Sequence, residues 1–224
     1  MLPIVGIIFG LFWLIGFEVL GGLNVSSTLR GFMMTVLTLM LTGGLHLDGL
    51  MDTSDAIFSH RDRRTRLRIL SDTHAGSFAV MSCVILIMAK TLLFSELFTL
   101  SPNPYSLTPN PYPLSPNPSP LIPIFSRLGM GILLTDMPFA KNDGLAATMG
   151  SSRKRSDNFV FAVMFLLLSL VSCRVIPVTF ILCLIFHVII CLRIFGGITG
   201  DLLGAFVELS EVIMLTGTVI EICI

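Results

Sequence analysis

The chain has 224 residues, of which 54% are hydrophobic and only 12% are charged, and its mean hydropathy is +0.90. A soluble domain is roughly a quarter charged, so this composition excludes an ordinary water-soluble fold and predicts one membrane-embedded unit over residues 1–224. Fourteen basic residues balance fourteen acidic ones, and a net charge of zero argues against a nucleic-acid-binding protein.

Apolar stretches of about 20 residues, long enough to cross a bilayer as helices, predict the fold class. Seven such stretches occur, at residues 3–23, 29–47, 76–98, 121–140, 158–173, 175–195 and 202–224. We therefore expect an all-α polytopic integral membrane protein with about six to seven transmembrane helices. The first stretch has no basic leader or small-residue cleavage site, which favours a retained helix over a signal peptide.

Residues 99–121, between the third and fourth stretches, contain the tandem heptads SPNPYSL, TPNPYPL and SPNPSPL. Proline lacks the N–H donor and has a fixed φ, so neither a helix nor a sheet continues through the repeat. We expect a flexible, Pro-rich tandem-repeat insertion without a catalytic part. A ligand for a proline-binding module is the less favoured alternative.

Basic residues cluster in two of the predicted loops and indicate the orientation of the chain. They are Arg61, Arg63, Arg64, Arg66 and Arg68 in one loop and Lys141, Arg153, Lys154 and Arg155 in the other. The positive-inside rule places both loops in the cytoplasm and the uncharged proline-rich segment outside. The glycine-rich turn 196–201 then also faces the cytoplasm.

The strongest acidic motif follows the second stretch, where Asp48, Asp52 and Asp55 recur at i, i+4 and i+7. On a helix these side chains lie within about 60° of one another. Three carboxylates on one stripe repel one another unless a divalent cation lies among them, and such oxygen ligands suit Mg²⁺ or Mn²⁺. A solvated acidic face is the alternative interpretation.

Further acidic groups precede the third stretch, with Asp72, and the seventh, with Asp201, Glu208 and Glu211. Asp201 and Glu208 are seven residues apart and share a helix face, while Glu211 lies to one side. Glycines around Asp201 would let the backbone approach a phosphate closely. Acids, bases and glycines at one predicted face suggest metal-assisted phosphoryl transfer.

Several basic side chains admit two interpretations. Arg64 and its neighbours either pair with phosphate oxygens of a nucleotide or only mark topology and contact anionic lipid. His46 either donates to a substrate or is a structural histidine. Lys90, inside the third stretch, either snorkels or pairs with another span, and Arg127 in the fourth needs a partner or the outer interface.

Four motifs, in order along the chain, resemble those of the adenosylcobinamide-GDP ribazoletransferase family, also called cobalamin (5′-phosphate) synthases. They are PIVG (residues 3–6), TGGLHLDGLMDTSD (42–55), ILSDTHAGSF (69–78) and GGITGDLLGA with two following glutamates (196–211). The resemblance covers nearly the whole chain outside the proline repeat, which is foreign to the family pattern. Relative to that pattern we also expect some tens of N-terminal residues to be missing.

The resemblance implies a multi-pass enzyme of the bacterial inner membrane with its active site on the cytoplasmic side. It implies that adenosylcobinamide-GDP is joined to α-ribazole, or to α-ribazole 5′-phosphate, giving adenosylcobalamin (5′-phosphate) and GMP, with Mg²⁺ required. Beyond these substrates and the surrounding lipid, a homo-oligomer is a possible assembly.

Carried over residue by residue, the resemblance implies that Asp48, Asp52 and Asp55 hold the metal and the diphosphate. Asp72 would be a further ligand or the base for the attacking hydroxyl. The remaining substrate-binding residues that we expect are His46, Arg64, Thr199, Asp201, Glu208 and Glu211.

Two other functions compete with this assignment. A CDP-alcohol phosphatidyltransferase also uses aspartates on membrane helices, but its DG-x-x-A-R…G-x-x-x-D-x-x-x-D motif is absent here. A cation-coupled transporter would place acidic residues deep in several spans and would have broken helices in paired halves. No inverted repeat is visible in the sequence.

Overall fold

The computed structural model describes residues 2–100, 119–141, 157–172 and 174–223. Its α-helices are α1 (Leu2–Gly21), α2 (Ser27–Thr42), α3 (Leu45–Phe58), α4 (Arg63–Ile69), α5 (Ser77–Leu100), α6 (Ile122–Asp136), α8 (Asp157–Val171), α9 (Val175–Ile190) and α10 (Gly200–Cys223). A short 3₁₀ helix, η1 (Ser119–Leu121), precedes α6, and a π-helical segment, η2 (Cys191–Phe195), continues α9. These ranges contain no strand beyond one isolated bridge, which confirms the all-α class. Residues 101–118 of the heptad repeat and the basic residues 153–155 lie outside the described residues, whereas the last three residues of the repeat form η1.

Four helical segments are long and apolar enough to cross a bilayer: α1, α5, α9 continued by η2, and α10. The pair α2 and α3 passes the same test only together and is bent by 90° between them. Among the residues that the structure describes, four helices are thus candidate spans, or five with the bent pair, whereas the sequence predicted about six to seven. The difference arises partly because α6 and α8 have only 15 residues each, short of the roughly 20 that a span needs.

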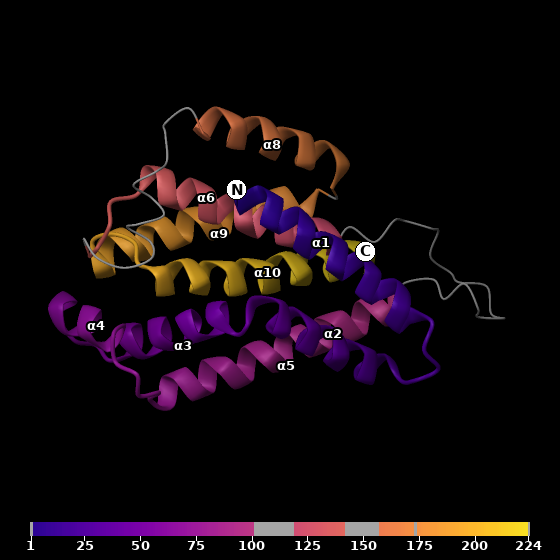
Figure 1. Cartoon of the computed structure of the whole chain (residues 1–224), viewed down its shortest axis with the longest axis horizontal. Helices are drawn as coiled ribbons and strands as arrows, with labels where there is room; N and C mark the ends of the chain where they lie inside the picture. The colour runs from indigo at the N-terminus through magenta and orange to yellow at the C-terminus, as the bar shows by residue number, and fades with distance from the viewer. Residues whose placement is uncertain (1, 101–118, 142–156, 173, 224) are drawn as a thin grey trace.

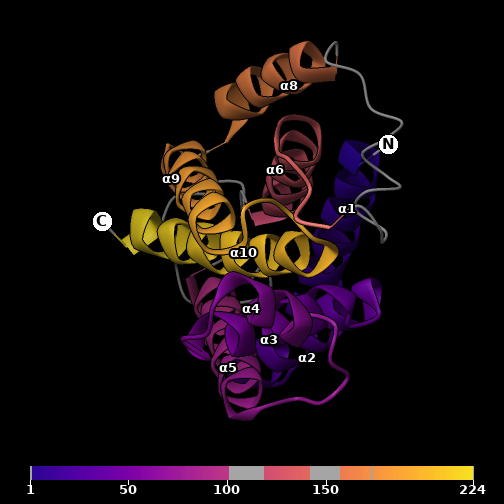
Figure 2. The same cartoon turned by 90° about the vertical axis from the view of Figure 1, so that its left-hand side faces the viewer.

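Helix α10 forms the centre of the bundle. It contacts α6 and α9 on one side and α3 and α5 on the other, as Figures 1 and 2 show from two directions. In the most apolar 18-residue stretch of α10, 67% of the residues are buried. The corresponding share is 22–28% in the other spanning helices, which expose apolar side chains around the molecule. Buried phenylalanines, including Phe94, Phe125, Phe180 and Phe206, fill the core.

The second predicted stretch, 29–47, is not one helix. Gly43 and Gly44 both adopt left-handed φ, 60° and 76°, a conformation that costs glycine little and other residues more. Their N–H groups donate to the carbonyls of Met40 and Leu39, which closes the end of α2. The acidic motif, expected at the end of a span, therefore forms the separate helix α3.

Candidate active site

The acidic motif of α3 lies directly against the start of α10. A Cβ at Gly49 would lie 2.6 Å from the carbonyl oxygen of Asp201 and 3.0 Å from its Cα. One turn further along, a Cβ at Gly204 would lie 3.1 Å from the Cα of His46. Two glycines thus let the backbones of α3 and α10 touch, and this contact joins two motifs that are about 150 residues apart in the chain.

Carboxylates from three segments gather around this contact. Asp52 on α3 is partly buried and experiences the negative charges of four other carboxylates: Asp48, Asp55, Asp72 and Asp201. Asp201 is also partly buried, whereas Asp48 and Asp72 are exposed. The five aspartates that the sequence singled out therefore belong to one acidic cluster at one end of the bundle.

Asp55 has a structural task within this cluster. Its Oδ2 accepts a hydrogen bond of 2.6 Å from the N–H of Gly76, and its Oδ1 accepts one of 2.9 Å from the N–H of Ala79. These donors belong to the start of α5, where helical N–H groups lack intrahelical partners. A Cβ at Gly76 would lie 2.7 Å from Asp55 Oδ2, so only glycine leaves room for the carboxylate.

Asp72 lies in the exposed turn before α5. Its Oδ1 accepts hydrogen bonds from the His74 ring, with 2.7 Å to Nδ1, and from the His74 N–H at 3.1 Å. These hydrogen bonds from His74 lower the pKa of Asp72, which keeps the side chain ionised at neutral pH. Asp72 is thus an exposed carboxylate whose charge acts on Asp52.

Glu208 and Glu211 lie elsewhere, in the interior of the bundle. Both are almost completely buried, and Lys90 Nζ on α5 is 2.6 Å from Glu208 Oε2 and 2.8 Å from Glu211 Oε2. Arg127 on α6 also pairs with Glu211, which accepts a further hydrogen bond of 3.2 Å from the Ser126 hydroxyl. These four side chains form a neutral, buried quartet of charges that links α10 to α5 and α6. Its members are Lys90, Arg127, Glu208 and Glu211.

The quartet settles the roles of Lys90 and Arg127, for which the sequence allowed two interpretations each. Lys90 pairs with another span, one of the two expectations, and Arg127 finds its partner on α10 and stacks 4.5 Å from the centre of the Phe9 ring. His46 is partly buried at the start of α3. It is close enough to Arg127, Glu211 and Lys90 to interact with their charges. His46 therefore stands between the buried quartet and the acidic cluster.

The turn that leads into α10 is fixed by neighbouring segments. Ala140 donates to the Ile198 carbonyl at 2.9 Å, and Ile198 donates to the Pro138 carbonyl at 2.8 Å, so residues 138–140 pair with this turn. The buried Thr199 accepts a hydrogen bond of 3.3 Å from the N–H of Leu202, and its hydroxyl is 3.4 Å from Asp201 Oδ2. Its hydroxyl thus caps α10 and orients Asp201.

Arginines of α4 reach the same turn. The guanidinium of Arg63 packs against Gly196 so closely that a Cβ there would overlap it. Arg64, the arginine that we expected to bind substrate, is exposed. Its backbone N–H donates to the side chain of Asp62, which caps α4. No signal in the sequence distinguished Arg63 from its neighbours, because the distinction depends on which face of a short helix meets η2.

The acidic cluster offers the donors that Mg²⁺ prefers, namely carboxylate oxygens. Within the described ranges, no three acidic, histidine or cysteine side chains are close enough to form a ready-made metal cage. Mg²⁺ usually keeps several waters and is bound by one or two carboxylates together with substrate phosphates. A pair of carboxylates from Asp48, Asp52 and Asp201 would fit that mode of binding, whereas both oxygens of Asp55 already accept backbone hydrogen bonds.

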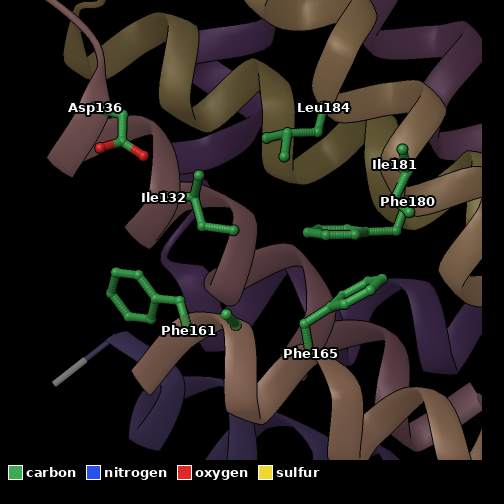
Figure 3. A pocket seen from close by; sticks show the side chains of 8 residues that line it. Ile132, Asp136, Phe161, Phe165, Phe180, Ile181 and Leu184 are labelled. Carbon is green, nitrogen blue, oxygen red and sulfur yellow. The ribbon is translucent and has the colours of Figure 1, made fainter. Parts of the chain in front are cut away.

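A separate cavity of about 250 Å³ lies between α6, α8 and α9. Figure 3 shows its lining, which is aromatic and aliphatic apart from one carboxylate at the end of α6. The lining residues are Ile132, Asp136, Phe161, Ala162, Phe165, Phe180, Ile181 and Leu184. None of the five clustered aspartates lines it, so the cavity is not an extension of the acidic cluster.

Fold and site together define a polytopic α-helical membrane protein with a polar, carboxylate-rich centre at one end. The family model described as cobalamin-5-phosphate synthase matches residues 1–219, so the chain belongs to that family. The resemblance inferred from the four motifs is thereby confirmed.

Similar proteins carry a consistent name. An adenosylcobinamide-GDP ribazoletransferase of Clostridium perfringens (strain SM101 / Type A) is 31% identical over 217 residues, covering 93% of this chain and 81% of the relative. One from Halalkalibacterium halodurans is 33% identical over 218 residues, covering 88% and 78%. One from Clostridium botulinum (strain Alaska E43 / Type E3) is 29% identical over 222 residues, covering 94% and 82%. No solved structure matches the chain.

Proposed function

We propose that this chain is a Mg²⁺-dependent ribazoletransferase. It joins adenosylcobinamide-GDP to α-ribazole, or to α-ribazole 5′-phosphate, and releases GMP. The observation that carries this proposal is the contact between Gly49 and Asp201, which places the signature motifs of α3 and α10 around one acidic cluster. Family membership and the names of the relatives support the same reaction.

The reaction is a phosphoryl transfer. A hydroxyl oxygen of the ribazole bonds to the phosphorus attached to cobinamide, and the bond from that phosphorus to the oxygen of GMP breaks. The hydroxyl proton passes to a carboxylate, and GMP leaves with the electron pair. In such reactions the protein mainly positions the reactants and stabilises charge.

Residues of the acidic cluster divide these tasks. Carboxylates from Asp48, Asp52 and Asp201, taken in pairs, would hold the metal ion, which would neutralise charge on the diphosphate. Asp72, ionised and exposed beside them, accepts the proton of the attacking hydroxyl. Asp55 holds α3 against the start of α5 through its two backbone hydrogen bonds and thereby keeps Asp52 in place.

The acidic cluster faces the cytoplasm in this proposal, and the membrane is the bacterial inner membrane. The arginine-rich helix α4 contacts α3 and η2, so positive charges lie at the same end as the acidic cluster. The positive-inside rule assigns such an end to the cytoplasm.

A transporter is less well supported by the interior of the bundle. Its acidic residues deep in the spans, Glu208 and Glu211, are paired with Lys90 and Arg127. Carboxylates neutralised in this way do not offer a cation a vacant pathway through α10. We therefore carry no second function forward.

The test uses the purified chain in detergent with Mg²⁺, adenosylcobinamide-GDP and α-ribazole, and measures cobalamin and GMP by chromatography. The expected result is equal amounts of both products. An Asp52→Asn variant should lose turnover by a factor of about 100 or more, because a metal-holding carboxylate becomes a neutral amide. Absence of products from wild-type protein that binds the substrate would refute the proposal.

A further inference from the structure

We propose that Arg63 and Lys141 form a diphosphate-binding pair at the edge of the acidic cluster, an inference that rests on the proposed function. The two residues come from different parts of the chain, the helix α4 and the segment after α6. Both are placed by the same short turn, residues 196–199, which leads into α10. They would bind the diphosphate of the nucleotide substrate while the carboxylates hold its metal ion.

Arg63 is positioned without a charge partner. Its guanidinium packs against the backbone of Gly196, which has φ 71° and lacks the Cβ that would displace it. In the ranges that the structure describes, the Arg63 side chain makes no hydrogen bond and no ion pair. A guanidinium that is held in place but unpaired has its five donors available, and its planar shape matches two phosphate oxygens at once.

Lys141 is placed by the pairing of residues 138–140 with the same turn. Its backbone neighbour Ala140 donates to the Ile198 carbonyl, which fixes where the lysine leaves the bundle. Its ammonium group donates to the hydroxyl of Ser71, the residue before Asp72, and its charge acts on Asp201. Lys141 therefore lies at Ser71 and near Asp201, and its ammonium group keeps donors for a further oxygen.

The electrostatics of the end of the bundle favour a diphosphate as the ligand. The five aspartates repel a polyphosphate anion. Without basic groups nearby, the metal ion alone would have to neutralise the negative charge of both the aspartates and the substrate. The guanidinium of Arg63 and the ammonium of Lys141, both at the turn that leads into α10, would supply positive charge to the diphosphate. This division, with carboxylates for the metal and basic groups for phosphate oxygens, is the usual arrangement of phosphoryl-transfer sites.

The test measures binding of Mg²⁺-pyrophosphate to the purified full chain by isothermal titration calorimetry. We expect Arg63→Ala and Lys141→Ala each to weaken binding about tenfold, equivalent to about 1.4 kcal/mol. Arg68→Ala, on the exposed side of the same helix, is the matched control and should bind like wild type. Arg63→Lys should be intermediate, because it keeps the charge and loses the planar fork.

A second variant separates position from charge. Gly196→Ala retains Arg63 but places a Cβ where the guanidinium lies, so it should weaken pyrophosphate binding as Arg63→Ala does. In the activity assay, Arg63→Ala should raise KM for adenosylcobinamide-GDP more than it lowers kcat. Variants are compared only when their thermal unfolding in detergent matches wild type.

The outcomes distinguish this inference from the proposed function. Wild-type-like pyrophosphate binding by Arg63→Ala, or an equal loss in Arg68→Ala, would overturn the diphosphate-binding pair even if cobalamin is formed. Lack of pyrophosphate binding by wild-type protein would also overturn it. Wild-type protein that binds pyrophosphate through Arg63 and Lys141 but forms no cobalamin would instead refute the reaction and leave the pair standing.

Discussion

Gly49 on α3 faces the backbone of Asp201 on α10, and a Cβ on that glycine would lie 2.6 Å from the Asp201 carbonyl oxygen. The separation between the acidic residues of the two helices is therefore set by backbone contact and not by flexible side chains. Backbone contact of this kind holds catalytic groups more rigidly than long side chains can. The acidic cluster depends on the absence of a single methyl group.

Gly49→Ala should reduce turnover while the protein still folds. The added Cβ meets main-chain atoms that cannot rotate away, so α3 must move relative to α10. A displacement of about 1 Å in an active site can cost roughly 100-fold in rate. Gly21→Ala, where a Cβ meets nothing within 4 Å, is the control and should retain activity. Equal kcat in the two variants would show that the close contact has no catalytic consequence.

Asp55 should contribute to stability in the absence of any metal ion. Asp55→Ala removes both acceptors at the start of α5 and should lower the free energy of unfolding by about 1 kcal/mol, the usual effect of losing a helix cap. Asp55→Asn keeps one acceptor oxygen, so its free energy of unfolding should lie between those of Asp55→Ala and wild type. Thermal unfolding in EDTA tests this, and identical melting of all three proteins would mean that Asp55 serves only as a metal ligand.

Breaking the buried quartet should be far more damaging than changing an exposed charge on the same helix. Lys90→Met leaves Glu208 without a partner and should destabilise the protein by about 3–5 kcal/mol. The double variant Lys90→Met, Glu208→Gln should recover much of this loss, since no buried charge is left unpaired there. Glu96→Gln, exposed on α5, is the control. Thermal unfolding in detergent measures all four proteins, and a wild-type melting temperature for Lys90→Met would contradict the quartet.

The sequence predicted the parts of the site that depend on local spacing and on motif order. The i, i+4, i+7 spacing of Asp48, Asp52 and Asp55 does place them on one helix, and the convergence of Asp72 and Asp201 with them agrees with the predicted common face. The all-α class followed from the lengths of the apolar stretches. Both predictions depend only on residue spacing within a few turns of one helix or on the hydropathy of the chain, and both can be read from the sequence.

Long-range pairing could not be predicted in the same way. Glu211 meets Lys90 across 121 residues, and Asp55 meets Gly76 across 21, so their roles depend on how helices pack. The sequence did not predict that Glu208 and Glu211, expected at the substrate, are buried and paired with Lys90 and Arg127. The break at Gly43 was also missed, because the apolar pattern continues through it and only the left-handed backbone ends α2.

Manganese binding, followed by electron paramagnetic resonance, tests the shared site most directly. Wild type, Asp52→Asn on α3 and Asp201→Asn on α10 are titrated with Mn²⁺, with Glu96→Gln as the control. We predict that both aspartate variants bind Mn²⁺ at least about tenfold more weakly than wild type and the control. Wild-type affinity in Asp201→Asn alone would contradict a single metal site built from α3 and α10.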